Sequence, residues 1–302
     1  MEINLRYRNN LLILGAGASK DYGLPVWKEL DSLIKEKLKN GGENQYSRAK
    51  DVLVWLDKVG EKNEYKTIDE CIAKESVSKV YHSDGDSVEN DLFSSIKDIF
   101  NEVYRENNEG WITKLSDKIL RHPENGLEEK MAFVSYNYDN VLEKNLLRFG
   151  YLPGKHSRLN NKPRLDELGT VRVPVLYAHG NLYLKSEIPQ GSHTERHYKT
   201  MKSGNAGYID AVSCYESDNH TVKHEPYADK LGLYILGLGA GLKFNLNKLE
   251  LNLYKGVSQI SVTISEAKND EEIIKFLNNK FKVPIDKIFV YRTCSELIET
   301  CF

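Results

Sequence analysis

The sequence predicts an α/β fold, a Rossmann-like doubly wound parallel sheet with a helical insertion. Continuous apolar runs at 11–14 and 233–236 are typical of strands that are buried on both faces of a sheet. Both runs end in glycines, and apolar residues with helical spacing over 26–38 follow the first one. A strand, a glycine turn and a helix form the opening of a nucleotide-binding βαβ unit.

The remaining elements follow from local periodicity. Helices are predicted at 49–59, 67–75, 92–104, 111–120, 140–149 and 270–281, and strands at 132–135, 171–178, 260–264 and 287–291. Strands alternate with helices except in one block, which shows helical patterns only. We therefore predict one domain over 1–302, with a Rossmann core at about 1–45 and 126–302 and a helical insertion at about 46–125.

Three segments are harder to interpret. Pro174 suits an edge strand or a strand start better than a central strand, because proline cannot donate a ladder hydrogen bond. Leucines three to four positions apart over 242–253 favour a helix packed on the sheet, with an association surface as the alternative. Residues 184–230 are polar and without clear periodicity, which indicates a long loop.

Composition excludes several classes of protein. Lys and Arg (42) nearly balance Asp and Glu (44), which argues against a nucleic-acid-coating protein, and 40% apolar residues exclude a disordered chain. No run approaches the roughly 18 consecutive apolar residues of a membrane span, and no secretion signal is evident. Four scattered cysteines indicate a reducing compartment, so we expect a cytoplasmic protein without disulfides.

The first glycine turn reads Gly15-Ala16-Gly17-Ala18-Ser19. Glycines after a buried strand let backbone N–H groups approach a phosphate. The dehydrogenase fingerprint G-x-G-x-x-G fails here, because its last position is Lys20. A tight turn without a ligand is the alternative. Ser19 is a candidate for contact with a phosphate or ribose, or equally for a helix cap.

Taken together, four motifs resemble those of the sirtuin superfamily, in the same order. They are Gly15-Ala16-Gly17-Ala18-Ser19 with Pro25, then Ser135-Tyr136-Asn137-Tyr138-Asp139, then Ala178-His179-Gly180, then Gly237-Leu238-Gly239. The resemblance implies an NAD+ pocket contacted by Gly15, Ala16, Gly17, Ser19, Pro25, Gly237 and Gly239. It implies Asn137, His179 and Asp139 as catalytic residues.

The chain departs from the protein-deacylating members of that superfamily. Those members carry a four-cysteine zinc ribbon, whereas only Cys214 lies between His179 and Gly237, so a tetrahedral thiolate site cannot form. Tyr136 stands where deacylases typically have Gln. The chain is more similar to the sirtuin-like NAD+ hydrolases of bacterial anti-phage defence, which lack the ribbon and often carry a helical insertion.

This closer resemblance implies NAD+ as the substrate, no metal, and an effector role in abortive infection. It also implies a homo-oligomer and a separate activating subunit, such as a hexameric ATPase or another phage-sensing protein. A non-catalytic NAD-sensing module and an NAD-dependent deacylase or ADP-ribosyl transferase are the alternatives.

Each candidate catalytic residue has a chemical reason and a simpler alternative. His179 suits a general base because its ordinary pKa of about 6.5 lies near neutrality; the alternative is a buried histidine at a strand end. Asn137 can position the ribose or the attacking water, and Asp139 can hold the nicotinamide carboxamide or face the ribosyl cation. Turn and cap chemistry is the alternative for both, and Asp139 can cap a helix from Asn140.

Other polar residues are weaker candidates. The pairs His193 with His197 and His220 with His224 have zinc-ligand spacing only on a helix, and no helical pattern supports them. We therefore favour solvated histidines there. The carboxylates at 69–70 can help to close the pocket, but a solvated helix face is the favoured interpretation.

Overall fold

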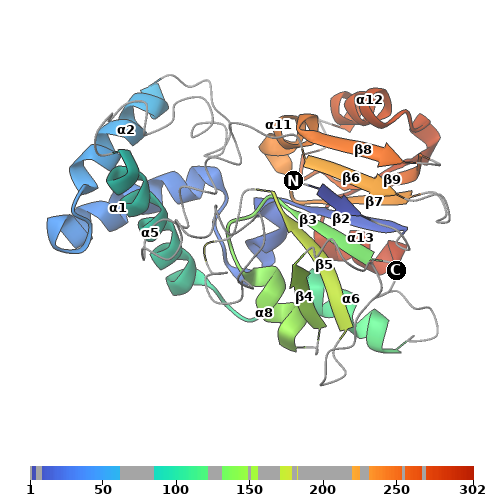
Figure 1. Ribbon diagram of the computed structural model, residues 1–302, viewed down its shortest axis with the longest axis horizontal. Helices are drawn as coiled ribbons and strands as arrows, with labels where there is room; N and C mark the ends of the chain where they lie inside the picture. Colours follow the sequence, from blue (N-terminus) through green and yellow to red (C-terminus); the bar gives the residue numbers. More distant parts are fainter. Residues whose placement is uncertain are drawn as a thin grey trace.

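The fold is built on a seven-stranded sheet with the order β10-β9-β7-β2-β3-β5-β4, and every neighbouring pair is parallel. The computed structural model describes residues 2–4, 9–61, 85–121, 131–148, 151–155, 171–178, 182, 220–224, 231–253, 256–266 and 270–302. Figure 1 shows this sheet with helices on both of its faces. The predicted α/β, Rossmann-like doubly wound fold is confirmed.

The elements of the described residues are as follows. The strands are β1 (Glu2–Asn4), β2 (Asn10–Leu14), β3 (Met131–Ser135), β4 (Tyr151–Lys155), β5 (Val171–Tyr177), β6 (His220–His224), β7 (Leu231–Leu236), β8 (Leu249–Leu253), β9 (Val257–Thr263) and β10 (Ile288–Tyr291). The α-helices are α1 (Trp27–Gln45), α2 (Ala49–Glu61), α5 (Gly85–Val103), α6 (Trp111–Arg121), α8 (Val141–Arg148), α11 (Leu242–Asn247), α12 (Asp270–Phe281) and α13 (Cys294–Cys301). Short 3-10 helices are η1 (Ala16–Tyr22), η3 (Gly239–Gly241) and η5 (Ile285–Lys287).

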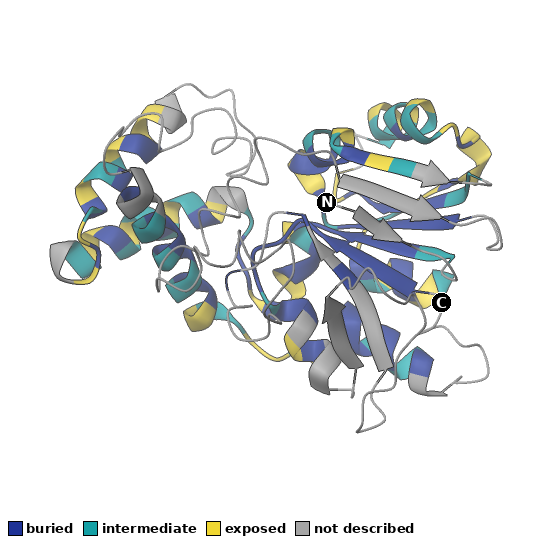
Figure 2. Cartoon of the chain, viewed as in Figure 1, coloured by how far each residue is buried: buried dark blue, intermediate teal, exposed yellow. Residues whose placement is uncertain are grey.

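The central strands β2, β3 and β7 are mostly apolar because both faces of the sheet are covered. Along β2, Leu12 and Leu14 belong to one core cluster, whereas Leu11 and Ile13 belong to the other. Side chains alternate between the faces of a strand, so one apolar run supplies both cores. Figure 2 shows these central strands as buried.

The described part of the predicted insertion contains only helices, α2, α5 and α6. Helices α1, α2 and α5 pack on one another and lie to one side of the sheet (Figure 1). Trp55 and Phe93 are fully buried among them. Helix α6 instead packs against α13 and α8, beside the sheet. The predicted helix at 67–75, with its two carboxylates, lies outside the described residues.

Two predictions about the second half of the chain were wrong. The predicted helix over 242–253 ends at Asn247, and β8 follows it. Leucines at 249, 251 and 253 alternate with Glu250 and Asn252, and this period of two is that of a strand. Strand β8 pairs with β6 in a separate three-stranded parallel sheet, β1-β6-β8, so the segment predicted as a loop at 184–230 also contains a strand.

Strand β5 is not an edge strand, since it lies between β3 and β4. Pro174 is accommodated because the ladder with β3 begins only at Val175, one residue later. Among the described residues, no helix has the length and apolarity that a membrane span requires.

The chain path places a crevice at β2. From β2 the chain goes to β3 on one side, and it returns later to β7 on the other side. Such a reversal of strand order separates the loops that leave the carboxyl ends of the strands, and ligands of open α/β sheets bind there.

Candidate functional site

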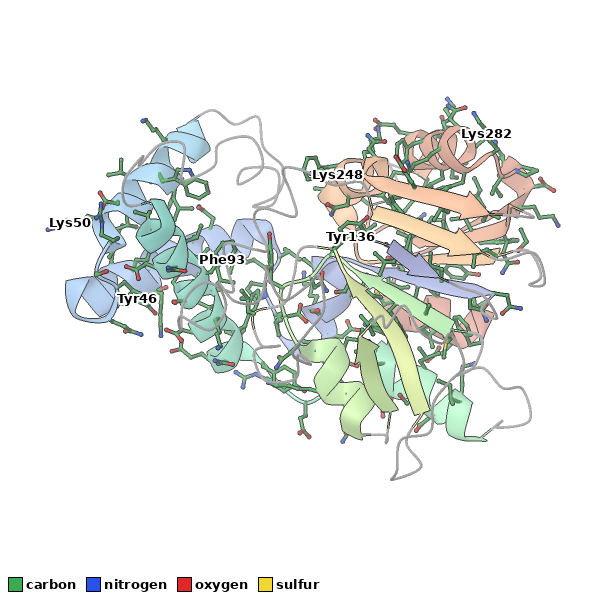
Figure 3. All side chains as sticks on the ribbon, in the orientation of Figure 1. Tyr46, Lys50, Phe93, Tyr136, Lys248 and Lys282 are labelled. Carbon is green, nitrogen blue, oxygen red and sulfur yellow. The ribbon has the colours of Figure 1, made fainter. Side chains whose placement is uncertain are left out.

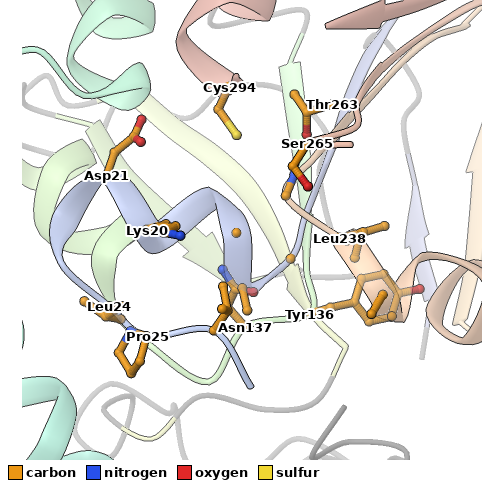
Figure 4. Close-up of a pocket in the computed structure, with 18 of the residues that line it drawn as sticks. Lys20, Asp21, Leu24, Pro25, Tyr136, Asn137, Leu238, Thr263, Ser265 and Cys294 are labelled. Atoms are coloured by element: carbon orange, nitrogen blue, oxygen red, sulfur yellow. The ribbon is translucent and has the colours of Figure 1, made fainter. Parts of the chain in front are cut away.

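A cavity of about 570 Å³ opens at the carboxyl ends of β2, β3, β7, β9 and β10. Each of these strands contributes the residues that directly follow it, such as Gly15, Asn137, Gly237, Ser265 and Arg292. The volume is typical of small-molecule sites, which span about 300–1,000 Å³. Figure 4 shows the residues of η1, of the β3 end and of the β7 end facing this space.

The two glycine loops meet backbone to backbone. The Gly17 N–H donates to the Gly237 oxygen at 2.8 Å, and the Gly15 N–H donates to the Leu236 oxygen at 2.9 Å. A Cβ at Gly15 would lie 2.6 Å from the Leu238 Cα, and one at Gly237 would lie 2.0 Å from the Ala18 nitrogen. These glycines are therefore required for the contact between the loops, and both loops line the cavity.

Helix η1 is held from behind by α6. The Trp111 Nε1–H donates to the Ala18 oxygen at 2.6 Å, and the Ile112 N–H donates to the Tyr22 hydroxyl at 3.1 Å. The residue before η1, Gly15, has no side chain to cap its first N–H groups. The start of η1 thus faces the cavity through Gly15, Ala16 and Gly17.

Ser19 connects two side chains that follow β3. Its hydroxyl donates to the Asp139 Oδ2 at 2.7 Å and accepts from the Asn137 Nδ2 at 3.1 Å. All three residues are buried. Asn137 and Asp139 line the cavity, whereas Ser19 lies behind them and is not part of its wall. Sequence positions more than a hundred residues apart are therefore joined in one hydrogen-bonded chain.

Asp139 also caps the helix that follows it. Its Oδ1 accepts the N–H of Val141, the first residue of α8, at 2.9 Å, and this i to i+2 hydrogen bond is typical of an Asx turn that caps the helix start. Burial raises the pKa of the Asp139 carboxyl above its ordinary value of 3.8, while the hydrogen bonds from Ser19 and Val141 and the charge of Lys144 oppose this rise.

The amide of Asn137 is only half satisfied. Its Nδ2 donates to Ser19, but its Oδ1 is buried and has no hydrogen-bond partner. A buried polar atom without a partner costs about 1–3 kcal/mol, so native proteins contain few of them. Asn137 lines the cavity but this oxygen itself has almost no exposed surface, so only a donor that binds closely against the side chain can satisfy it.

The cavity has one apolar and one polar end. Leu24, Pro25, Leu30 and Phe100 line the first, and Figure 4 shows Leu24 and Pro25 opposite the polar end. At the polar end are Asp21, Thr263, Ser265, Glu266, Arg292, Thr293 and Cys294. An apolar end suits a flat ring, and hydroxyl and carboxylate groups suit the hydroxyls of a sugar.

One charged group at the polar end of the cavity, Arg292, is already paired. Arg292 forms a bidentate pair with Asp270, with one contact of 2.8 Å, and this pairing lowers the pKa of Asp270. Burial raises the pKa of Asp21. Burial also raises the pKa of the Cys294 thiol to about 12, so this cysteine is not a nucleophile at neutral pH.

The structure brings together most of the predicted site. Gly15, Ala16, Gly17, Pro25, Asn137, Asp139, Gly237 and Gly239 all line the cavity. His179 lies outside the described residues. The Ala178 N–H donates to the Ser135 oxygen at 2.8 Å, so Ala178 lies beside the end of β3.

Several lining residues were missed by the sequence analysis. Thr263 and Ser265 follow β9, and Arg292 and Thr293 follow β10. Polar residues directly after two predicted strands were the available signal, because the carboxyl ends of parallel strands share one edge. Tyr136 was treated only as a departure from a motif. Its hydroxyl donates to the Asn245 oxygen at 3.1 Å and ties β3 to α11, and Figure 3 shows it at the tip of β3.

His220 and His224 do not lie on a helix, so their spacing is not that of a helical zinc-ligand pair, which the absence of a helical pattern in the sequence already disfavoured. Both positions belong to β6, where four residues span about 13 Å. His193, His197 and Cys214 lie outside the described residues. Within the described ranges, no three His, Cys, Asp or Glu side chains form a group that could hold a metal ion.

Fold and cavity together define a Rossmann-like α/β protein with a ligand-sized crevice at its topological switch point. No protein-family model and no curated protein matches the chain.

Proposed function

We propose that the protein is an NAD+ hydrolase that cleaves the bond between nicotinamide and ribose, giving nicotinamide and ADP-ribose. The observation that carries the proposal is the buried, unpartnered Asn137 Oδ1 in the wall of a cavity formed by two glycine loops. The order of the four motifs supports NAD+ as the ligand. Asn137 is the amide of the second motif, and it lies against the first motif through Ser19.

The reaction requires little acid catalysis from the protein. Water attacks the ribose C1′, the C–N bond breaks, and its electrons neutralise the pyridinium as nicotinamide leaves. The attacking water then loses a proton, for which His179 is the proposed base. Asn137 accepts a hydrogen bond from the water or from a ribose hydroxyl and orients it. The negative charge of Asp139 favours the developing ribosyl cation through space.

The test is nicotinamide release. Purified protein is incubated with NAD+, and nicotinamide and ADP-ribose are separated and quantified. We expect both products in equal amounts, and we expect His179→Ala and Asn137→Ala each to abolish release while retaining the native fold. Ser95→Ala is the matched control, because it removes a buried hydroxyl that donates to the Leu92 oxygen within α5.

Other outcomes identify other functions. NAD+ binding without nicotinamide release would indicate a sensing module. Release that strictly requires an acyl-lysine peptide or an acceptor protein would indicate a deacylase or an ADP-ribosyl transferase. Either result contradicts the hydrolase.

The biological role forms a second layer of the proposal. Uncontrolled NAD+ cleavage is lethal to a cell, so we propose an abortive-infection effector that acts as a homo-oligomer under a separate activating subunit. A hexameric ATPase or another phage-sensing protein is the proposed class of partner. Full activity of the isolated chain would contradict the need for a partner, and it would leave the hydrolase assignment intact.

A further inference from the structure

The two hydrogen bonds that join Asn137 to Ser19 and Ser19 to Asp139 have fixed donors and acceptors. The Ser19 hydroxyl donates its single proton to the Asp139 Oδ2, as a carboxylate that only accepts requires. Toward Asn137 the Ser19 oxygen is then an acceptor, and Asn137 must present its NH2 group. The amide oxygen is left over, and it is the buried atom that has no partner.

The hydrogen bond that caps the start of α8 fixes the orientation of the Asp139 carboxylate. The Asp139 Oδ1 accepts the Val141 N–H, so only Oδ2 faces Ser19. The carboxylate cannot turn away without losing the cap. All three residues are buried, so bulk water has little access to these hydrogen bonds.

We propose that Ser19 and Asp139 are positioning residues that present the Asn137 oxygen to the cavity as an acceptor, so that the group bound there is a hydrogen-bond donor. In NAD+ hydrolysis this donor is a ribose hydroxyl or the attacking water. The identity of the ligand rests on the proposed function, whereas the orientation of the amide does not. In addition to its proposed effect on the ribosyl cation through space, Asp139 acts on the ligand through Ser19 and Asn137.

The substitution Asp139→Asn tests the direction of these hydrogen bonds without changing the shape of the side chain at position 139. The new side chain keeps its oxygen on the Val141 N–H, so its NH2 group faces Ser19. Ser19 then accepts from position 139 and donates to Asn137, whose amide turns over and presents NH2 to the cavity. We expect the variant to keep native thermal stability. We expect its NAD+ affinity to be about tenfold weaker or more, since the Asn137 NH2 group, a donor, now faces the donor group of the ligand.

A second substitution should reverse this loss. In Asn137→Asp combined with Asp139→Asn, Ser19 donates to one oxygen at position 137 and the other oxygen again accepts from the ligand. The net charge is unchanged. We expect the double variant to bind NAD+ more tightly than Asp139→Asn does, an outcome that a merely structural role of Asp139 does not give.

The matched control is Asp98→Asn. Asp98 accepts the Tyr46 hydroxyl at 2.6 Å in the helical block, away from the cavity. We expect unchanged NAD+ affinity in this variant, measured by calorimetry. Unchanged affinity in Asp139→Asn, or a double variant no better than it, would overturn the proposal.

The amide orientation also has a readout that needs no ligand. In the wild-type protein one proton of the Asn137 NH2 group is bonded to Ser19 and the residue is buried, so NMR should find the NH2 protons protected from exchange with water. In Asp139→Asn they face the cavity, and we expect exchange about tenfold faster. Unprotected protons in the wild-type protein contradict the proposed orientation. If the wild-type protein shows this protection but does not bind NAD+, the proposed function fails and the positioning role stands.

Discussion

Two walls of the cavity are constructed in different ways. The wall between β2 and β7 is backbone against backbone, with Gly17 bonded to Gly237. The wall at β3 is a chain of side chains, in which Ser19 joins Asn137 to Asp139. The first wall requires the absence of side chains and is sensitive to added volume. The second requires particular donors and acceptors, so it is sensitive to polarity at constant volume.

The largest expected effect is on the backbone wall. In Gly237→Ala the added Cβ meets the Ala18 nitrogen at 2.0 Å, and φ at Gly237 is +67°. We expect a loss of at least about 3 kcal/mol in the free energy of unfolding, measured by denaturant titration. Gly239→Ala is the control: φ is +48° but no atom lies within 4 Å of the Cβ, so only a strain of about 1–2 kcal/mol is expected. Equal losses in both variants would show that contact between the loops is unimportant.

The next effect is on the side-chain wall. Asn137→Ala removes one hydrogen bond and one unsatisfied oxygen, so we expect the free energy of unfolding to change by less than about 1 kcal/mol. We expect the rate of nicotinamide release to fall at least about a hundredfold, which is typical for loss of one orienting group. A destabilised variant with retained turnover would reverse the contrast between the two walls.

The pH dependence of stability probes Asp139 directly. Its pKa is raised by burial, so the folded state binds this proton more tightly than the unfolded state. The contribution to stability is therefore present at low pH and is lost as pH rises from 3.8 through the folded pKa. Denaturant titrations over this range should show a smaller fall with rising pH in Asp139→Asn than in the wild-type protein. An identical slope would mean that Asp139 does not titrate differently on folding.

The smallest effect is expected at Cys294. Its thiol lines the cavity, but burial raises its pKa to about 12, so the thiolate is scarce at neutral pH. We expect alkylation of Cys294 by iodoacetamide to be slow in the folded protein and fast in urea, as measured by peptide mass spectrometry. Rapid alkylation of the folded protein would show that the polar end of the cavity is more open than its burial indicates.

The sequence predicted the elements whose patterns are set by local burial. The run at 11–14 is buried on both faces in the centre of the sheet, and the predicted strand at 132–135 is its neighbour. The segment at 242–253 could not be assigned in this way, because leucines at 242, 246, 249 and 253 fit a helix whereas leucines at 249, 251 and 253 fit a strand. Pairing with β6, a strand distant in sequence, decides in favour of the strand.

The residues of the candidate site that belong to a short motif could be predicted from the sequence. The residues that reach the cavity only through the strand order of the sheet could not. Asn137 and Gly237 were found because short motifs name them. Thr263 and Arg292 were not, because they reach the cavity only through the position of β9 and β10 in the sheet. The burial of Ser19 behind the wall also depends on tertiary packing, and periodicity carries no information about it.

The residues of the cavity wall are spread widely along the sequence, which determines when the cavity can form during synthesis of the chain. The wall draws on residues from Gly15 to Cys294, and its central contact joins Gly17 to Gly237. A nascent polypeptide that has passed only β5 lacks the partner loop and, apart from Asp21, the residues of the polar end. The cavity can therefore close only after the segment from Gly237 to Cys294 has been synthesised, so the proposed toxic activity cannot arise before that point.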